Sequence, residues 1–169
     1  AEVLAELIKG RDGRNALHSP QQVEVGAPRC FEEFMDVQQA VLVMGYRTQI
    51  TYPDANYYGL LVGNGILGGF PHSKLFMNVR ERASLAYSVS SSIEGSKGLL
   101  TISAGISAEQ QEQAVEIIQE QVRSIQEGMI SREELEQTKS GMISSMNSMN
   151  DSPAGLINRN LIGIVHNQL

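Results

Sequence analysis

The period of the hydrophobic pattern changes within residues 73–106, and this change limits the chain to folds that combine helices with a sheet. Residues 73–84 follow the period of a helix, and from Tyr87 onward the period is two. After the polar turn EGSKG, residues 99–106 (LLTISAGI) predict a second strand, so we expect two adjacent antiparallel strands. The helix should bury Leu75, Phe76, Val79 and Ala83, and the first strand should set Tyr87, Val89 and Ser91 against Ser88 and Ser90.

Two further elements are expected before this region. Residues 38–48 are rich in β-branched and apolar residues and predict a mostly buried strand. A helix should begin near Ala55 and end at Gly68 and Gly69, ahead of Pro71. Its predicted apolar face consists of Tyr58, Leu61, Val62 and Ile66.

Two long helices are predicted after the sheet. Ser107 with Gln110, and Ser131 with Glu134, have the spacing of capping boxes, and Gly128 stands where a glycine commonly ends a helix. Helices that are segregated from the strands in this way predict an α+β fold, in which helices pack on one face of an antiparallel β-sheet. The predicted apolar stripes are Val115, Ile118, Val122 and Ile125 in the first helix, and Leu135, Met142, Met146 and Met149 in the second, the latter being typical of core or of a helix–helix seam.

Composition excludes several classes of protein. The 169 residues, of which 41% are hydrophobic, suit one globular domain, and a net charge of -6 disfavours nucleic acid as a partner. No apolar run approaches the roughly 20 residues that span a membrane. Cys30 is the only cysteine and no secretion signal precedes it, so we expect a cytoplasmic protein.

The start of the sequence is read separately from the rest. Residues 1–30 are interpreted as the end of a helix, stopped by Gly10, followed by a linker rich in Gly, Pro, Asn and Arg. Both ends of the sequence read as if cut from a longer chain. Residues 31–169 are expected to form a single α+β domain.

Two features could suggest a cofactor or metal site, but neither has the surrounding sequence that such a site needs. Gly63, Gly65 and Gly68 spell G-x-G-x-x-G, but a helical pattern precedes them where a dinucleotide site needs a strand. We expect Gly63 and Gly65 to permit close helix packing instead. The histidines are dispersed and no H-x-x-E-H occurs, so no cofactor or metal site is predicted in this chain; they are His18, His72 and His166.

Three segments together resemble the insulinase/pitrilysin family of zinc metallopeptidases. They are NGILGGFPHSKLFMNVRERASLAYSVSSS, KGLLTISAGI and GMISREELEQTK, and the likeness covers about residues 31–150. The match is to the second, non-zinc domain of the family. Among bacterial members the chain resembles small paired proteins, some of which are inactive peptidase homologues.

This resemblance implies a fold, a site and a set of partners. The fold would be metallopeptidase-like, as in mitochondrial processing peptidase. In the family, a first domain carries zinc, and the second contributes an arginine and a tyrosine, seven residues apart, to peptide binding. Arg80 and Tyr87 match that pair. The resemblance therefore implies a peptide substrate and a zinc-bearing domain or subunit that completes a dimer or pseudo-dimer, without which this chain should not cleave peptides.

Two alternatives stay open at this point. On spacing alone, Arg80 reads as a solvated helix residue and Tyr87 as a strand residue that packs its ring. The same family fold also serves as a catalytically inactive scaffold or assembly subunit. The sequence does not tell whether residues 99–106 lie at a sheet edge.

Overall fold

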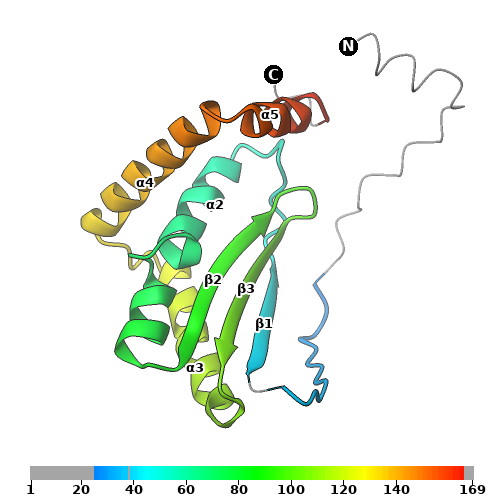
Figure 1. Ribbon diagram of the computed structural model, residues 1–169, viewed down its shortest axis with the longest axis vertical. Helices are drawn as coiled ribbons and strands as arrows, with labels where there is room; N and C mark the ends of the chain where they lie inside the picture. Colours follow the sequence, from blue (N-terminus) through cyan, green and yellow to red (C-terminus); the bar gives the residue numbers. More distant parts are fainter. Residues whose placement is uncertain (1–24, 38, 166–169) are drawn as a thin grey trace, which may run out of the picture.

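The computed structural model describes residues 25–37 and 39–165, which form one antiparallel sheet with helices against one of its faces (Figure 1). The three strands are β1 (Ala40–Arg47), β2 (Ala86–Glu94) and β3 (Leu99–Ile106). This is the predicted α+β architecture. Residues 25–37 contain no helix or strand, and the predicted helix end before Gly10 lies outside the described residues.

Seven helical segments accompany the sheet among the described residues. The helix predicted from Ala55 begins two residues later and continues as a wider π-helix, and the helix predicted over residues 73–84 is mostly π-helical as well. The segments are α2 (Tyr57–Asn64), η1 (Gly65–Gly69, π), η2 (Phe76–Arg82, π), η3 (Ala108–Gln110, 3₁₀), α3 (Gln111–Gln126), α4 (Arg132–Asn150) and α5 (Pro153–Val165).

β3 is the central strand of the sheet. It pairs antiparallel with β1 on one side, where Val43 faces Ser103, and with β2 on the other, where Ser90 faces the same Ser103. Residues 99–106 are therefore not at an edge, and a peptide that added itself to this sheet as a strand would have to pair with β1 or β2.

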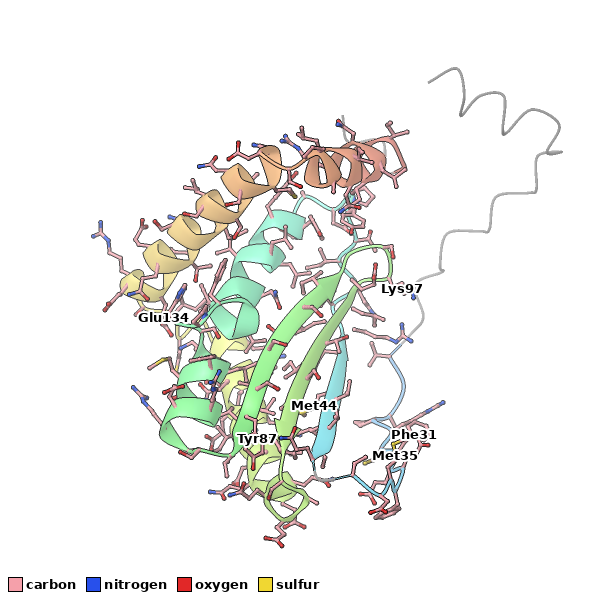
Figure 2. All side chains as sticks on the ribbon, in the orientation of Figure 1. Phe31, Met35, Met44, Tyr87, Lys97 and Glu134 are labelled. Atoms are coloured by element: carbon pink, nitrogen blue, oxygen red, sulfur yellow. The ribbon has the colours of Figure 1, made fainter. Side chains whose placement is uncertain are left out.

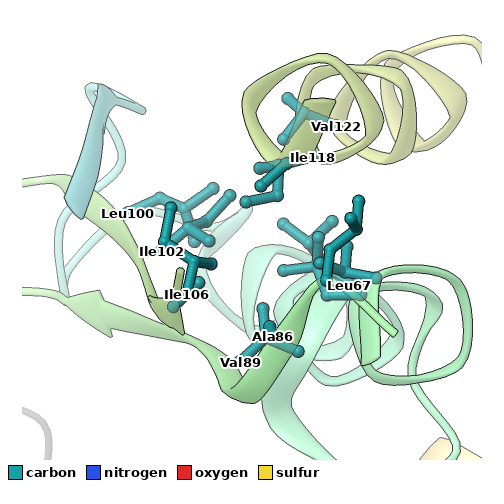
Figure 3. Packing of buried hydrophobic residues seen from close by; sticks show 13 residues of the cluster. Leu67, Ala86, Val89, Leu100, Ile102, Ile106, Ile118 and Val122 are labelled. Atoms are coloured by element: carbon teal, nitrogen blue, oxygen red, sulfur yellow. The ribbon is translucent and has the colours of Figure 1, made fainter. Parts of the chain in front are cut away.

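The core lies between the sheet and the helices (Figure 3). Ile102 and Ile106 of β3 pack there with Ile118 and Val122 of α3, and their burial on one face follows from the alternation of side chains along a strand. The other members of this buried cluster are Leu67, Leu75, Val79, Leu85, Ala86, Val89, Leu100, Ala104 and Ala114.

Some of the residues predicted to point inward are buried, and others are not. Leu75 and Val79 are fully buried, as expected. Tyr58 is 69% exposed, because the helix turns its neighbour Tyr57 inward, 5.0 Å from the ring of Tyr52.

In α4 the methionine stripe, expected as core or as a helix–helix seam, is not core: Met146 is 51% exposed, and Met142 and Met149 are only partly buried. A Cβ on Gly155 of α5 would lie 2.6 Å from Cγ of Met149, which agrees with a helix–helix seam at that end.

The outer face of the sheet is open to solvent among the described residues. Val41 and Val43 project from it, and both are exposed, whereas Leu42 and Met44 pack against the core. The prediction of a mostly buried strand at residues 38–48 is therefore wrong for one of its two faces, because helices cover only the other.

One of the two predicted capping boxes is present. In α4, the hydroxyl of Ser131 accepts from the N–H of Glu134 at 3.1 Å, and the Glu134 carboxylate accepts from the N–H of Ser131 at 2.7 Å. At Ser107 the box is absent, because the N–H of Gln110 donates to the backbone carbonyl of Ser107 in a 3₁₀ turn. Gly128 adopts a φ of 71° after α3, which confirms its predicted place.

Of the two glycines expected to permit close helix packing, Gly65 does so and Gly63 does not, and Gly68, expected to end the helix, is also closely packed. A Cβ on Gly65 would lie 2.5 Å from Cγ2 of Thr138, and one on Gly68 would lie 2.8 Å from the backbone nitrogen of Ser91. Gly63 has open space around it, so the expectation of close packing is wrong there.

Glu134 links the start of α4 to the helix that follows Ser73. Its carboxylate lies 2.8 Å from Nζ of Lys74 and also closes the capping box. Partial burial opposes ionisation of this carboxyl, but hydrogen bonds from Lys74 and Ser131 outweigh burial and lower its pKa below 4.5.

The ionised carboxylate of Glu134 should therefore stabilise the fold at pH values above the pKa that Glu134 has in the unfolded chain. This contribution to stability should be lost in acid. A lowered pKa in the folded state means that the unfolded chain binds the proton more tightly, so the contribution falls as pH drops through the folded pKa. We expect Glu134→Gln to reduce the free energy of unfolding at pH about 7 and to reduce it less at pH about 3. Urea unfolding at both pH values measures this, with Glu133→Gln as the control; an equal loss at both would contradict it.

Candidate functional site

Arg80 lies in the last turn of η2, a helix that is fixed on three sides. Leu75 and Val79 bury one face of it in the core. On the flanks, Lys74 pairs with Glu134 of α4, and the amide of Asn78 donates to Oε1 of Gln121 in α3 at 2.8 Å. Arg80 itself points away from the core, and its side chain is 44% exposed.

The helix ends at Arg82, and two residues later Ser84 has a left-handed backbone with a φ of 55°. The N–H of Ser84 donates to the carbonyl of Arg80 at 3.1 Å, and the N–H of Leu85 donates to the carbonyl of Val79 at 3.0 Å. These bonds satisfy carbonyls that the helix would otherwise leave without partners. The chain thereby reverses directly into β2.

Tyr87 is turned outward by a bulge at the start of β2. Ala86 pairs with Ile106 and Ser88 pairs with Gly105, so Tyr87 is an extra residue in β2 opposite consecutive residues of β3. The predicted alternation placed Tyr87 on the same side as the buried Val89, and this is wrong. Tyr87 is 65% exposed near the start of β2 (Figure 2).

Arg80 and Tyr87 line the same open pocket, which has a volume of about 390 Å³. It lies where the end of η2, the turn at Ser84 and the start of β2 meet the first turn before α3. Polar groups dominate its wall, and Arg80 brings a fixed positive charge. The residues that line it are Arg80, Glu81, Ser84, Leu85, Ala86, Tyr87 and Gln110.

The guanidinium of Arg80 has two neighbours among the described residues. Its Nε lies 3.7 Å from Oε1 of Glu81, and both side chains of this pair are largely exposed, so the pair contributes little. Its Cζ lies 4.7 Å from the ring centroid of Phe76, within range of a cation–π interaction. Most of the guanidinium's hydrogen-bonding capacity therefore remains for a ligand in the pocket.

Sequence reasoning missed two residues of this site. Gln110 was expected to close a capping box, but the 3₁₀ turn removes that role and the residue lines the pocket. Phe76 was expected in the core, but it is only partly buried and contacts Arg80. The spacing of Phe76 and Arg80, four residues apart, is the signal that could have indicated the pair.

Comparison with known proteins identifies the fold family. The sequence profile described as the Peptidase M16 inactive domain matches residues 2–142. The chain belongs to this family. The resemblance to the insulinase/pitrilysin metallopeptidases is thereby confirmed.

Individual M16 relatives agree with this assignment. The chain is 45% identical over 139 residues to the "Probable inactive metalloprotease YmfF" of Bacillus subtilis, covering 82% of this chain and 32% of that protein. A conserved protein from Enterococcus faecalis has a similar structure, with a TM-score of 0.73 and 38% identity over 78% of this chain and 31% of that one. An M16 inactive domain from Pseudomonas fluorescens, 23% identical over 80% of this chain and 32% of that one, shares the fold with a TM-score of 0.71. The M16 chain described here thus spans about a third of the length of these relatives.

The described part of this M16 domain contains no group of three side chains able to hold a metal ion. His72 has a structural role, since its Nε2 lies 3.1 Å from Oγ1 of the buried Thr138 and its ring stacks on Phe70. His18 and His166 lie outside the described residues. The described residues therefore do not fit the zinc site of a metallopeptidase.

Within the same residues, no helix is both long and apolar enough to cross a membrane.

The strained residue at the centre of the site gives a test of its backbone. A non-glycine residue in the left-handed region is unfavourable by about 1–2 kcal/mol, while glycine loses about 0.5–1 kcal/mol of extra entropy on folding. We expect Ser84→Gly to raise the free energy of unfolding by about 0.5–1 kcal/mol, and Ser84→Ala not to raise it. Urea unfolding of the three proteins measures this; a loss of stability in Ser84→Gly would mean that the turn is not left-handed.

The absence of a zinc site is a separate prediction for the whole chain. We expect the purified protein to bind no stoichiometric zinc, because its histidines are dispersed and its one cysteine cannot form a thiolate cluster. Elemental analysis after dialysis measures this. One tightly held zinc per molecule would contradict the prediction.

Proposed function

We propose that this M16 domain is the peptide-binding, non-zinc half of a zinc endopeptidase. Arg80 and Tyr87 would present hydrogen-bond donors to the backbone carbonyls of a peptide in the pocket. The observation that carries the proposal is that these two side chains, set on a helix and on a strand, line one open cavity.

The chemistry of the two groups suits this role. A guanidinium is always charged and offers five N–H donors in a planar fork, and a phenol adds an O–H donor. Neither has to exchange a proton at neutral pH to bind a carbonyl. Donors that are held in place also stabilise the negative charge that develops on a carbonyl oxygen during hydrolysis. Gln110 adds amide groups to the same wall of the pocket.

Hydrolysis itself would depend on a zinc site outside this chain. The described residues do not fit one, and this chain corresponds to about a third of the relatives' length. We propose that the zinc is carried either by another part of the same polypeptide or by a partner chain of the same family. The complete unit would then be a pseudo-dimer or a dimer.

We also propose that the protein works in a reducing cytoplasm. Cys30 is exposed and is the only cysteine, so the chain forms no internal disulfide. Cell fractionation would check the compartment, and recovery from an oxidising one would contradict it.

A catalytically inactive scaffold or assembly subunit is the second candidate. The name of the Bacillus subtilis relative, 45% identical over 139 residues, favours it because that protein is described as probably inactive. In a scaffold the pocket would be a remnant, and Arg80 and Tyr87 could be replaced without functional loss.

The pocket residues give the test of the first proposal. In the assembly that carries zinc, we expect Arg80→Ala and Tyr87→Phe each to lower kcat/KM for an internally quenched fluorescent casein by at least about tenfold, or about 1.4 kcal/mol of transition-state stabilisation. The chain alone should bind a fluorescein-labelled tryptic digest of β-casein, measured by fluorescence anisotropy, and Arg80→Ala should weaken that binding.

Two matched controls separate the site from general effects. Arg47→Ala removes an exposed cation at the end of β1, outside the pocket, and Tyr58→Phe removes an exposed phenol on α2. Neither should change kcat/KM by more than about twofold. A scaffold role is indicated instead if the labelled peptides do not bind, or if Arg80→Ala and Tyr87→Phe behave like these controls.

A further inference from the structure

Arg80 needs a support, because its own pairings hold it weakly. The pair with Glu81 is 3.7 Å long, and the two side chains are 44% and 50% exposed. Exposed pairs of this kind are screened by water and salt and restrain a long side chain poorly. An unrestrained arginine side chain occupies many rotamers. A peptide that bound it would have to restrict it to one, at a cost in conformational entropy.

Phe76 is placed to provide that support. Its ring centroid lies 4.7 Å from Cζ of Arg80, and the two residues are four apart, so they share one face of η2. Phe76 follows the fully buried Leu75 but is itself only partly buried, so it lies at the border between the core and the pocket. One face of the ring is therefore available to the guanidinium.

The helix that carries the ring is held in place by the rest of the structure. Lys74 pairs with Glu134 at 2.8 Å, Asn78 bonds to Gln121 at 2.8 Å, and Val79 is fully buried. These contacts come from both sides of Phe76 along the helix. A ring that projects from an anchored helix restricts where a flexible cation beside it can lie, and it uses none of the N–H donors of that cation.

We propose that Phe76 is a positioning residue, whose aromatic face holds the Arg80 guanidinium over the pocket in the orientation that binds a peptide. This inference rests on the proposed function. It requires an aromatic ring at position 76, because the attraction depends on the negative face of a π-system. An aliphatic side chain of similar size would fill the space and leave Arg80 unsupported.

A purely structural role for Phe76 predicts a different result for the same variants. If the ring only filled space, leucine would serve peptide binding nearly as well as tyrosine, provided the protein stayed folded. Any loss on changing it would also be independent of Arg80. The two roles are therefore separated by variants that change the ring in the presence and absence of the guanidinium.

The experiment uses the full chain with Phe76→Leu and Phe76→Tyr, each made with and without Arg80→Ala. Affinity for fluorescein-labelled tryptic peptides of β-casein is measured by anisotropy. We expect Phe76→Leu to weaken binding about threefold to tenfold, equivalent to about 0.6–1.4 kcal/mol, and Phe76→Tyr to stay within about twofold of the native chain. In the Arg80→Ala background, Phe76→Leu should have no further effect.

A second measurement does not depend on peptide binding. The Nε–H resonance of Arg80 in an NMR spectrum should be displaced by the ring current of Phe76, and Phe76→Leu should abolish this displacement while Phe76→Tyr keeps it. Thermal unfolding verifies that each variant is folded. Should Phe76→Leu not fold, Phe76→Met takes its place, because methionine adapts to irregular space without a ring.

The outcomes distinguish the inference from the function on which it rests. If Arg80→Ala weakens binding but Phe76→Leu and Phe76→Tyr act alike, the positioning role is overturned and the proposed function stands. The same conclusion follows if Phe76→Leu is equally harmful without Arg80. If Arg80→Ala has no effect on binding, the proposed function is overturned, and the NMR displacement alone decides whether Phe76 orders Arg80.

Discussion

Four buried side chains decide where the candidate site can form. Leu75 and Val79 precede the turn at Ser84, Leu85 and Ala86 follow it, and all four belong to the same apolar cluster. Burying both sides of a turn in one core leaves the chain little freedom between them, because the core is closely packed. The side chains that are not buried must then point outward, and Arg80 is among them. The site is thus a product of core packing around a helix end.

Much of this arrangement could be predicted from the sequence, wherever local pattern and tertiary packing agree. The alternating runs predicted two strands, and Ser131 with Glu134 predicted the start of α4, because both signals lie within a few residues. The facing of Tyr87 could not be predicted in this way. It depends on a bulge, and the bulge arises from the way β2 pairs with β3. The sequence of β2 alone does not specify the register of that pairing.

The role of Gln110 was missed for a related reason. Ser107 and Gln110 have the spacing of a capping box, but a backbone carbonyl competes successfully for the N–H that the serine hydroxyl would bind. Gln110 then becomes part of the pocket. Under the proposed function, such neutral or permanently charged donors would be the groups through which this M16 domain, whose described residues hold no metal cluster, acts on a peptide. Their placement, rather than any titration, would determine that contribution.

The central position of β3 has a consequence for how this domain opens. Both edges of β3 are hydrogen-bonded, and Leu100, Ile102, Ala104 and Ile106 are buried beneath it. We therefore expect its amides to exchange with deuterium mainly when the sheet comes apart, at a rate that reports the global free energy of unfolding. The amides of Ser84 and Leu85 are hydrogen-bonded within the turn, and Leu85 and Ala86 belong to the same buried cluster as β3. The backbone of the candidate site is thus tied to the most protected strand of the domain.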